Sequence, residues 1–110
     1  MAAPSPLVYL NVEVVPQGDR YLVHCRGKLI AGVCGTLYQT VHGLIPDRKQ
    51  IVLDLSDLEW IDSMGIGTLI RIHAGCRYTG CQLQLIHMGP RVKELLALTG
   101  LLGVFAGADV

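Results

Sequence analysis

The sequence has little charge, and the charges that it has cancel. Only 16% of its 110 residues are charged, with nine acidic and nine basic side chains. A protein that grips nucleic acid through its phosphates needs an excess or a patch of Lys and Arg, so this balance argues against direct nucleic-acid binding. Half of the residues are apolar, which argues against a disordered chain.

Long apolar runs, an export signal and clustered cysteines are also absent from the sequence. No apolar run reaches the roughly 18 residues of a membrane span. The N-terminus has neither the basic region nor the small-residue cleavage site of a signal peptide. The cysteines are scattered without a C-x-x-C pair, at Cys25, Cys34, Cys76 and Cys81. We therefore expect a cytoplasmic protein with no membrane span, whose cysteines are reduced and mostly buried.

The spacing of residues favours neither a metal site nor a catalytic one. The histidines show no H-x-x-x-H spacing and no pairing with cysteine; they are His24, His42, His73 and His87. Ser63 lacks a G-x-S-x-G elbow, and the glycines at 65 and 67 are not followed by the G-K-[ST] of a P-loop. We therefore expect no metal, no cofactor and no enzymatic activity.

The patterns that are present indicate one domain. We expect a flexible leader over residues 1–6, which contain two prolines, and a single domain over residues 7–110. The apolar side chains of Val8, Leu10, Val12 and Val14 alternate with others, which predicts a half-buried strand. Turn residues at 16–19 and a second strand over 21–26 then predict an antiparallel hairpin.

Helix and strand patterns alternate in the rest of the chain. Apolar spacing predicts helices over residues 31–45, 63–78 and about 90–99, and strands over 51–55 and 82–86. The expected stops are Pro46-Asp47 for the first helix, Gly80 for the second and Gly100 for the third. Pro90 suits the first turn of the third helix, and Val92, Leu95, Leu96 and Thr99 are expected on its buried side. Residues 101–105 are expected to form either a short edge strand or an apolar tail.

This order predicts an α/β fold. The sheet is expected to be mixed and to have four or five strands, because β-α-β connections give parallel pairs and the opening hairpin is antiparallel. Most of the predicted strands keep one polar face. About three or four helices should therefore cover mainly one face of the sheet.

One segment suggests a function. The strand over 51–55 is followed by an acidic loop with Asp57, Glu59 and Asp62, and then by a helix that starts at Ser63. Ser is a favoured N-cap, and a helix N-terminus also tolerates an attached phosphate. A phosphoserine would add about −1.5 to −2 charges beside these acidic residues, which is the physics of an on/off binding switch. The simpler alternative is that Ser63 only caps the helix.

Glycines at the start of this helix support the same hypothesis. Gly65 and Gly67 each weaken a helix by roughly 1 kcal/mol relative to Ala. Two such costs in the first turn indicate that something approaches the backbone closely there. Trp60 and Met64 flank the helix start, where each would either anchor a partner or fill the core.

The segment over residues 51–67 resembles the core of STAS domains, specifically of bacterial anti-sigma factor antagonists. The similarity continues at residues 81–85 and 91–101, where the L-x-x-T-G-L ending is similar to the family's last helix, and it covers about Leu7 to Phe105. The resemblance implies the STAS fold and a regulatory cycle. Unphosphorylated, such a protein binds an anti-sigma factor and frees the sigma factor. The anti-sigma factor is usually a serine kinase that phosphorylates the antagonist and ends the complex, and a phosphatase resets it.

The resemblance also implies roles for single residues. Ser63 would be the phosphoacceptor, Asp62 would fix the turn and face the kinase, and Gly65 would allow close approach. Ser56 and Asp57 would be neighbours in the same partner-binding surface.

One departure from the family is the start of the first helix, which is apolar and rich in glycine over residues 31–37. This composition is consistent with a homodimer or a larger assembly. The alternative function is therefore a STAS module without Ser63 phosphorylation, either in a stressosome-like complex or beside a lipid-transport ATPase.

Overall fold

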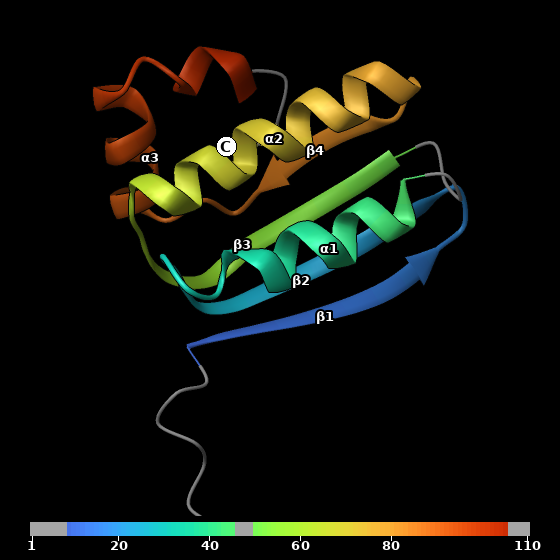
Figure 1. Ribbon diagram of the computed structural model, residues 1–110, viewed down its shortest axis with the longest axis horizontal. Coiled ribbons are helices and arrows are strands. Elements are labelled where there is room, and N and C mark those ends of the chain that lie inside the picture. The colour runs from blue at the N-terminus through green and yellow to red at the C-terminus, as the bar shows by residue number, and fades with distance from the viewer. Residues whose placement is uncertain (1–8, 46–49, 106–110) are drawn as a thin grey trace, which may run out of the picture.

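The chain folds into a four-stranded sheet with helices laid against it (Figure 1). A computed structural model describes residues 9–45 and 50–105. The elements follow in the order β1 (Leu10–Gln17), β2 (Arg20–Leu29), α1 (Cys34–Leu44), β3 (Gln50–Ile61), α2 (Ser63–Thr79), β4 (Gln82–Ile86), α3 (Pro90–Leu98) and the 3-10 helix η1 (Leu102–Phe105). The strand order in the sheet is β1-β2-β3-β4. The predicted α/β fold is confirmed.

The first two strands form the predicted antiparallel hairpin. Its turn has only two central residues, Gly18 and Asp19, and Gly18 has a left-handed φ of +62°. Glycine supplies this conformation without a steric cost. The turn predicted over residues 16–19 is too long, because Pro16 lies within β1 opposite Tyr21. β1 is an edge strand, where a residue without an N–H is tolerated.

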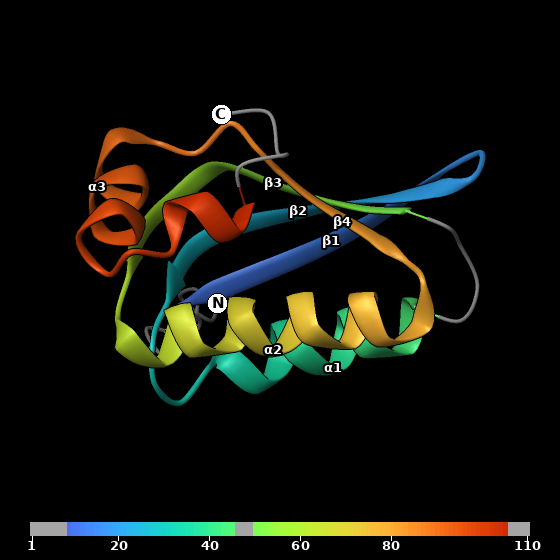
Figure 2. The ribbon, with the colours of Figure 1, turned by 90° about the horizontal axis from the view of Figure 1, so that it is seen from above.

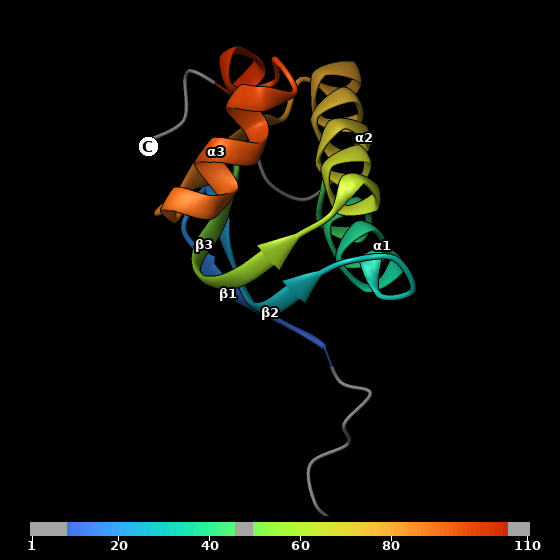
Figure 3. The same ribbon diagram turned by 90° about the vertical axis from the view of Figure 1, so that its left-hand side faces the viewer.

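The other strand pairs are parallel, so the sheet is mixed as predicted. β2 pairs with β3, and β3 pairs with β4. Helices α1 and α2 lie side by side against one face of the sheet (Figure 2). Helix α3 lies near the later half of β3, apart from this pair, with η1 beside it (Figure 3). In the part of the chain that the structure describes, the opposite face of the sheet carries no helix.

The core lies between the sheet and these helices. Its largest fully buried side chains come from the inward faces of strands and helices; they are Leu29, Leu37, Ile51, Leu53, Leu55, Ile61, Leu69, Ile72, Leu85, Leu96, Val23 and Val41. The apolar stripes predicted for α1 and α2 are confirmed, since Leu37, Val41, Leu69 and Ile72 are all among them. On the outward face, polar residues such as His24 and Asp54 pair across β2 and β3.

Strand β3 continues to Ile61, whereas the sequence predicts a strand that ends near Leu55 and an acidic loop after it. The continuation is hidden because the buried residues Leu55, Leu58 and Ile61 follow at intervals of three. Register shifts in the pairing of β2 with β3 add the extra residues. Such irregularities break the period of two that identifies a strand in a sequence. The predicted acidic loop is therefore the irregular end of a strand.

Helix α1 begins at Cys34, later than the predicted start at Ala31. The segment before it is a turn, in which Gly32 has a φ of +93°. A residue in this left-handed region cannot belong to an α-helix. Some expectations fall outside the described residues, namely those for the 1–6 leader, for Val8 and for the stop at Pro46-Asp47.

The end of the chain follows the predicted pattern with one exception. Helix α3 has Pro90 at its first position, and Gly100 lies just after its end with a φ of +74°. Thr99 is exposed rather than buried, and its hydroxyl donates to carbonyls of its own helix. Residues 102–105 form η1 instead of an edge strand, and Phe105 packs into the core.

Candidate functional site

Helix α2 begins at Ser63, and the residue that caps it is Asp62. The backbone of Asp62 is extended, and its Oδ1 accepts a hydrogen bond from the N–H of Gly65 at 2.9 Å. This is the N-cap role, so the prediction that Ser63 is the cap is wrong by one residue. A carboxylate is well suited to the role, because negative charge near a helix N-terminus is also favoured by the helix dipole.

Asp62 also ties α2 to a distant part of the chain. Its Oδ2 accepts a hydrogen bond from the N–H of Ala31 at 3.0 Å, although the two residues are 31 positions apart. The N–H of Asp62 donates to the carbonyl of Leu29 at 3.2 Å. One residue therefore joins the start of α2 to the end of β2 and to the turn before α1. No pattern in the sequence marks Ala31 or Leu29 as its partner.

These contacts explain the acidity of Asp62. Burial by itself raises the pKa of this carboxyl, but hydrogen bonds from the backbone N–H groups of Ala31, Gly65 and Met64 outweigh it. The net effect holds the pKa of Asp62 below its ordinary value. The carboxylate is therefore ionised in the folded protein at neutral pH, where it stabilises the junction.

Replacing Asp62 by alanine should lower the free energy of unfolding by about 1–2 kcal/mol, the usual cost of a lost N-cap. Chemical denaturation measures this loss. Because the pKa of Asp62 is lowered by folding, its stabilisation is complete above the ordinary Asp pKa of about 3.9 and is lost as the pH falls through the lower folded value. The difference between the wild type and Asp62→Ala should therefore shrink below about pH 4. A difference that stays constant in acid would contradict this assignment.

Ser63 is the first residue of α2, and its side chain is exposed. Among the described residues, none forms a hydrogen bond with its hydroxyl. Met64 follows it and is 60% exposed. The fold therefore does not depend on the hydroxyl of Ser63, and two adjacent side chains of the helix start are open to a partner.

Gly65 has an internal reason to be glycine. It is buried, and a Cβ at this position would lie 2.2 Å from the carbonyl oxygen of Leu29 and 2.7 Å from Cγ1 of Ile61. The close approach that the sequence predicts here is made by the chain's own strand β2. Gly65 is buried and has no exposed surface for a partner to contact. Gly67 differs, because a Cβ there meets nothing within 4 Å.

The four residues of the D-S-M-G turn therefore divide into two kinds. The first and the last, Asp62 and Gly65, hold the helix start against β2. The middle two, Ser63 and Met64, point away from the protein. The turn therefore holds the helix start in place and presents a hydroxyl and a thioether.

Trp60 lies near the end of β3 and is 38% exposed. The guanidinium of Arg91, at the start of α3, lies over its ring at 4.6 Å from the centroid. Such a cation–π contact fixes the ring while leaving part of it accessible. This position supports the anchor interpretation of Trp60 better than the core interpretation. Arg91 is a neighbour that the sequence does not predict.

Ser56 and Asp57 do not lie on the surface that Ser63 occupies. The Oδ2 of Asp57 is 2.9 Å from Nε2 of His24 and 3.8 Å from Nη2 of Arg26. His24 stands between two fully buried residues of β2, so its side chain points to the face of the sheet opposite the helices. Ser56 lines the same shallow hollow as Asp57 and Arg26. A phosphate on Ser63 would therefore lie beside Asp62 and not beside Asp57.

The described residues offer neither a metal-binding cluster nor a membrane-spanning helix. Over residues 9–45 and 50–105, no group of three or more His, Cys, Asp or Glu side chains is arranged to hold a metal ion. None of the helices described in the structure is long and apolar enough to cross a membrane.

Comparison with known families gives a match over nearly the whole chain. A family model described as "STAS domain" matches residues 9–109. Among curated proteins, "Putative anti-sigma factor antagonist BtrV" of Bordetella bronchiseptica is 29% identical over 62 residues. That alignment covers 56% of this chain and 53% of the relative, so the match spans about half of the relative's length.

Solved structures share the fold at low sequence identity. An anti-sigma factor antagonist from Mycobacterium paratuberculosis superposes with a TM-score of 0.76 at 21% identity, covering 93% of this chain and 87% of that one. The phosphorylated form of the Bacillus cell fate determinant SpoIIAA gives a TM-score of 0.67 at 16% identity, covering 87% and 86%. At these identities, the likeness establishes the architecture.

Proposed function

Because the family match extends over residues 9–109, the chain belongs to the STAS domain family, and we propose that it is an anti-sigma factor antagonist switched by phosphorylation of Ser63. In its unphosphorylated form it binds an anti-sigma factor and releases the sigma factor. The anti-sigma factor is also the serine kinase that ends the complex. The names of BtrV and of the Mycobacterium paratuberculosis protein support the antagonist role.

The observation that carries this proposal is the division of labour between Asp62 and Ser63. Asp62 caps α2 and bridges to Ala31, so the helix start is complete without the Ser63 hydroxyl. A phosphate on Ser63 would therefore change the surface and leave the support in place. The N-terminus of a helix also tolerates negative charge, because of its free N–H groups and its dipole.

The same geometry explains how a phosphate would end binding. A partner that seats the exposed Ser63 and Met64 side chains tightly has room for a hydroxyl. Phosphorylation adds about −1.5 to −2 charges and a bulky group at that point. The neighbouring Asp62 carboxylate is ionised and already hydrogen-bonded. The D-S-M-G turn contains no cation that would compensate the added negative charge. Trp60, held by Arg91, would add an aromatic anchor beside the contact.

The remaining parts of the cycle follow from this mechanism. The protein acts by binding rather than by catalysis, in the cytoplasm, where the kinase has ATP. A protein phosphatase restores the hydroxyl of Ser63. The sigma factor is reached through the anti-sigma factor, so the protein needs no direct contact with nucleic acid.

Phosphate transfer to Ser63 tests the proposal directly. The chain is incubated with ATP and an ATPase-type serine kinase encoded beside it, and the product is mapped by mass spectrometry. We expect one added phosphate on the wild type and none on Ser63→Ala.

Ser56→Ala is the matched control, because Ser56 is also exposed but lies with Asp57 on the opposite face of the sheet. This variant should be phosphorylated like the wild type. A phosphate that survives Ser63→Ala, or no phosphate at all on the wild type, would favour a STAS scaffold without a Ser63 switch.

A further inference from the structure

Helix α2 ends in a motif that brings two cysteines together. Gly80 has a φ of +79°, its N–H donates to the carbonyl of Arg77 at 3.4 Å, and the N–H of Cys81 donates to the carbonyl of Cys76 at 2.9 Å. This is the Schellman arrangement, in which a side-chain contact frequently joins the residue after the glycine to the residue five positions earlier, whose carbonyl accepts its N–H. Here these residues are Cys76 and Cys81.

Helix α3 ends in the same motif and shows what packing alone places there. The N–H of Gly100 donates to Ala97 at 3.1 Å, and the N–H of Leu101 donates to Leu96 at 2.8 Å. The paired positions hold two leucines that pack on the core, Leu96 and Leu101. In α2 the equivalent pair is a dithiol, so it has a chemistry that the leucine pair lacks.

The two thiols are not equivalent. The Cys81 thiol donates a hydrogen bond to the carbonyl of Gln82 at 3.7 Å, and each of the two cysteines affects the pKa of the other. Burial is the main cause that raises the pKa of Cys76, to about 12, and Cys81 adds to it. Burial also raises the pKa of Cys81, but the hydrogen bonds from Cys76 and from the backbone of Ile51 oppose the effect. Both thiols are therefore protonated in the folded protein at neutral pH, and Cys81 is the one whose neighbours partly offset the effect of burial.

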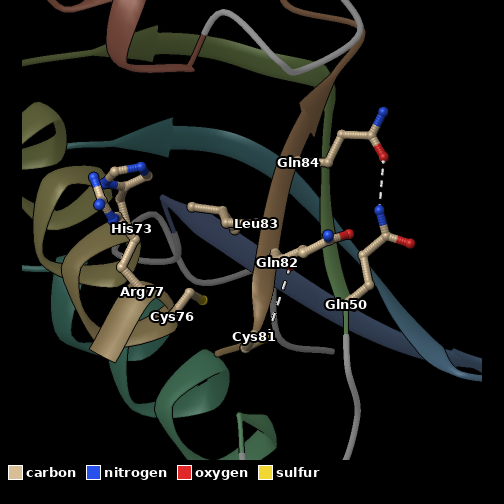
Figure 4. A pocket seen from close by; sticks show the side chains of 8 residues that line it. All are labelled: Gln50, His73, Cys76, Arg77, Cys81, Gln82, Leu83 and Gln84. Atoms are coloured by element: carbon tan, nitrogen blue, oxygen red, sulfur yellow. Dashed lines mark hydrogen bonds between the residues drawn. The ribbon is translucent and has the colours of Figure 1, made fainter. Parts of the chain in front are cut away.

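A pocket borders this pair, and the two cysteines in its wall are 1% exposed at Cys76 and 7% exposed at Cys81. Both cysteines line a pocket of about 460 Å³ between the end of α2 and the start of β4 (Figure 4). Its other walls include His73, Arg77 and Gln82, and Arg77 brings a positive charge. A nearby cation favours both the thiolate that attacks a disulfide and the thiolate that leaves it.

We propose that Cys76 and Cys81 are a redox-active pair that a small external disulfide, such as oxidised glutathione, converts to an intramolecular disulfide. The Cys81 thiolate attacks one sulfur of the reagent, which forms a mixed disulfide and expels one glutathione thiolate. Cys76 then loses its proton and attacks the Cys81 sulfur, which expels the second thiolate. Two protein thiols are oxidised, and one external disulfide is reduced to two thiols that take up the protons.

The motif keeps the two cysteines close together before the disulfide forms. The backbone hydrogen bond between residues 81 and 76 already holds the two cysteines at the same turn of the chain. The raised pKa values of both thiols make the reaction slow at neutral pH. Its rate should increase about tenfold for each pH unit, because only the thiolate attacks.

The test uses the 110-residue chain with Cys34→Ser, which removes the partly buried thiol outside the pair. After incubation with oxidised glutathione, intact mass spectrometry should show the loss of two hydrogens. Trypsin cleaves after Arg77, between the cysteines, so the disulfide should hold the two resulting peptides together until it is reduced. Adding Cys76→Ala should stop the reaction at a glutathione adduct on Cys81.

Cys81→Ala should slow all modification at Cys76 at least about tenfold, since burial raises the pKa of Cys76 to about 12 and little of it is thiolate. Circular dichroism checks that each variant is folded. The proposal is overturned if the folded protein loses no hydrogens while its urea-unfolded form does. It is also overturned if the Cys76→Ala variant gives no adduct.

Discussion

Replacing Gly65 by alanine should lower the free energy of unfolding by about 3 kcal/mol, at the upper end of the cost of overpacking a core. The new Cβ would lie 2.2 Å from the carbonyl oxygen of Leu29, which is backbone and has no rotamer to change. Either α2 or β2 must therefore move. That movement also strains the hydrogen bond from Asp62 to the same carbonyl. Thermal unfolding should shift down by more than about 10 °C.

Gly67→Ala is the matched control for this prediction. Gly67 lies two residues further along the same helix, and a Cβ there meets nothing within 4 Å. Alanine should therefore stabilise the helix by about 0.5–1 kcal/mol, because it loses less backbone entropy than glycine. Equal effects of the two substitutions would show that the start of α2 is not packed against β2 as described.

Replacing Ser63 by aspartate should weaken the complex with the anti-sigma factor about a hundredfold, equivalent to about 3 kcal/mol. The side chain is exposed at the helix start, so the added charge falls on the contact itself. The stability of the free protein should change by less than about 0.5 kcal/mol, because an acidic residue is accepted at a helix N-terminus. Titration calorimetry and thermal unfolding measure the two quantities separately.

Two control variants separate charge at the contact from charge in general. Ser63→Ala should bind like the wild type, because the partner has room for the smaller side chain. Ser56→Asp adds the same charge on the opposite face of the sheet and should leave the affinity unchanged. If Ser56→Asp weakens binding as much as Ser63→Asp, the partner recognises total charge, and the switch at Ser63 is not the mechanism.

The candidate site shows how far local sequence patterns reach. Its position between β3 and α2 is predictable, since a strand pattern and a helix pattern meet there. The exposure of Ser63 and Met64 follows once the helix start is known. The assignment of the cap is wrong by one residue, because Ser and Asp are both good caps and contacts with a distant segment of the same chain decide between them. The hydrogen bond from the N–H of Ala31, 31 positions away, favours Asp62 as the cap.

Asp57 and Gly65 illustrate the same limit from opposite directions. Asp57 is close to Ser63 in sequence but is held by His24 on the other side of the sheet. Gly65 is expected to admit a partner but admits the carbonyl of Leu29 instead. In both cases the residue type indicates that a close contact exists. Only the fold identifies the atom that makes the contact.

The order of the elements, the mixed sheet and the ends of α2 and α3 were determined by the sequence alone. These features depend on periodicity and on glycines such as Gly80 and Gly100, which act within a few residues of their own position. Tertiary structure decided the length of β3, the cap of α2 and the reason for Gly65. Each of these depends on β2, where register shifts and backbone carbonyls have no signature in the side-chain pattern.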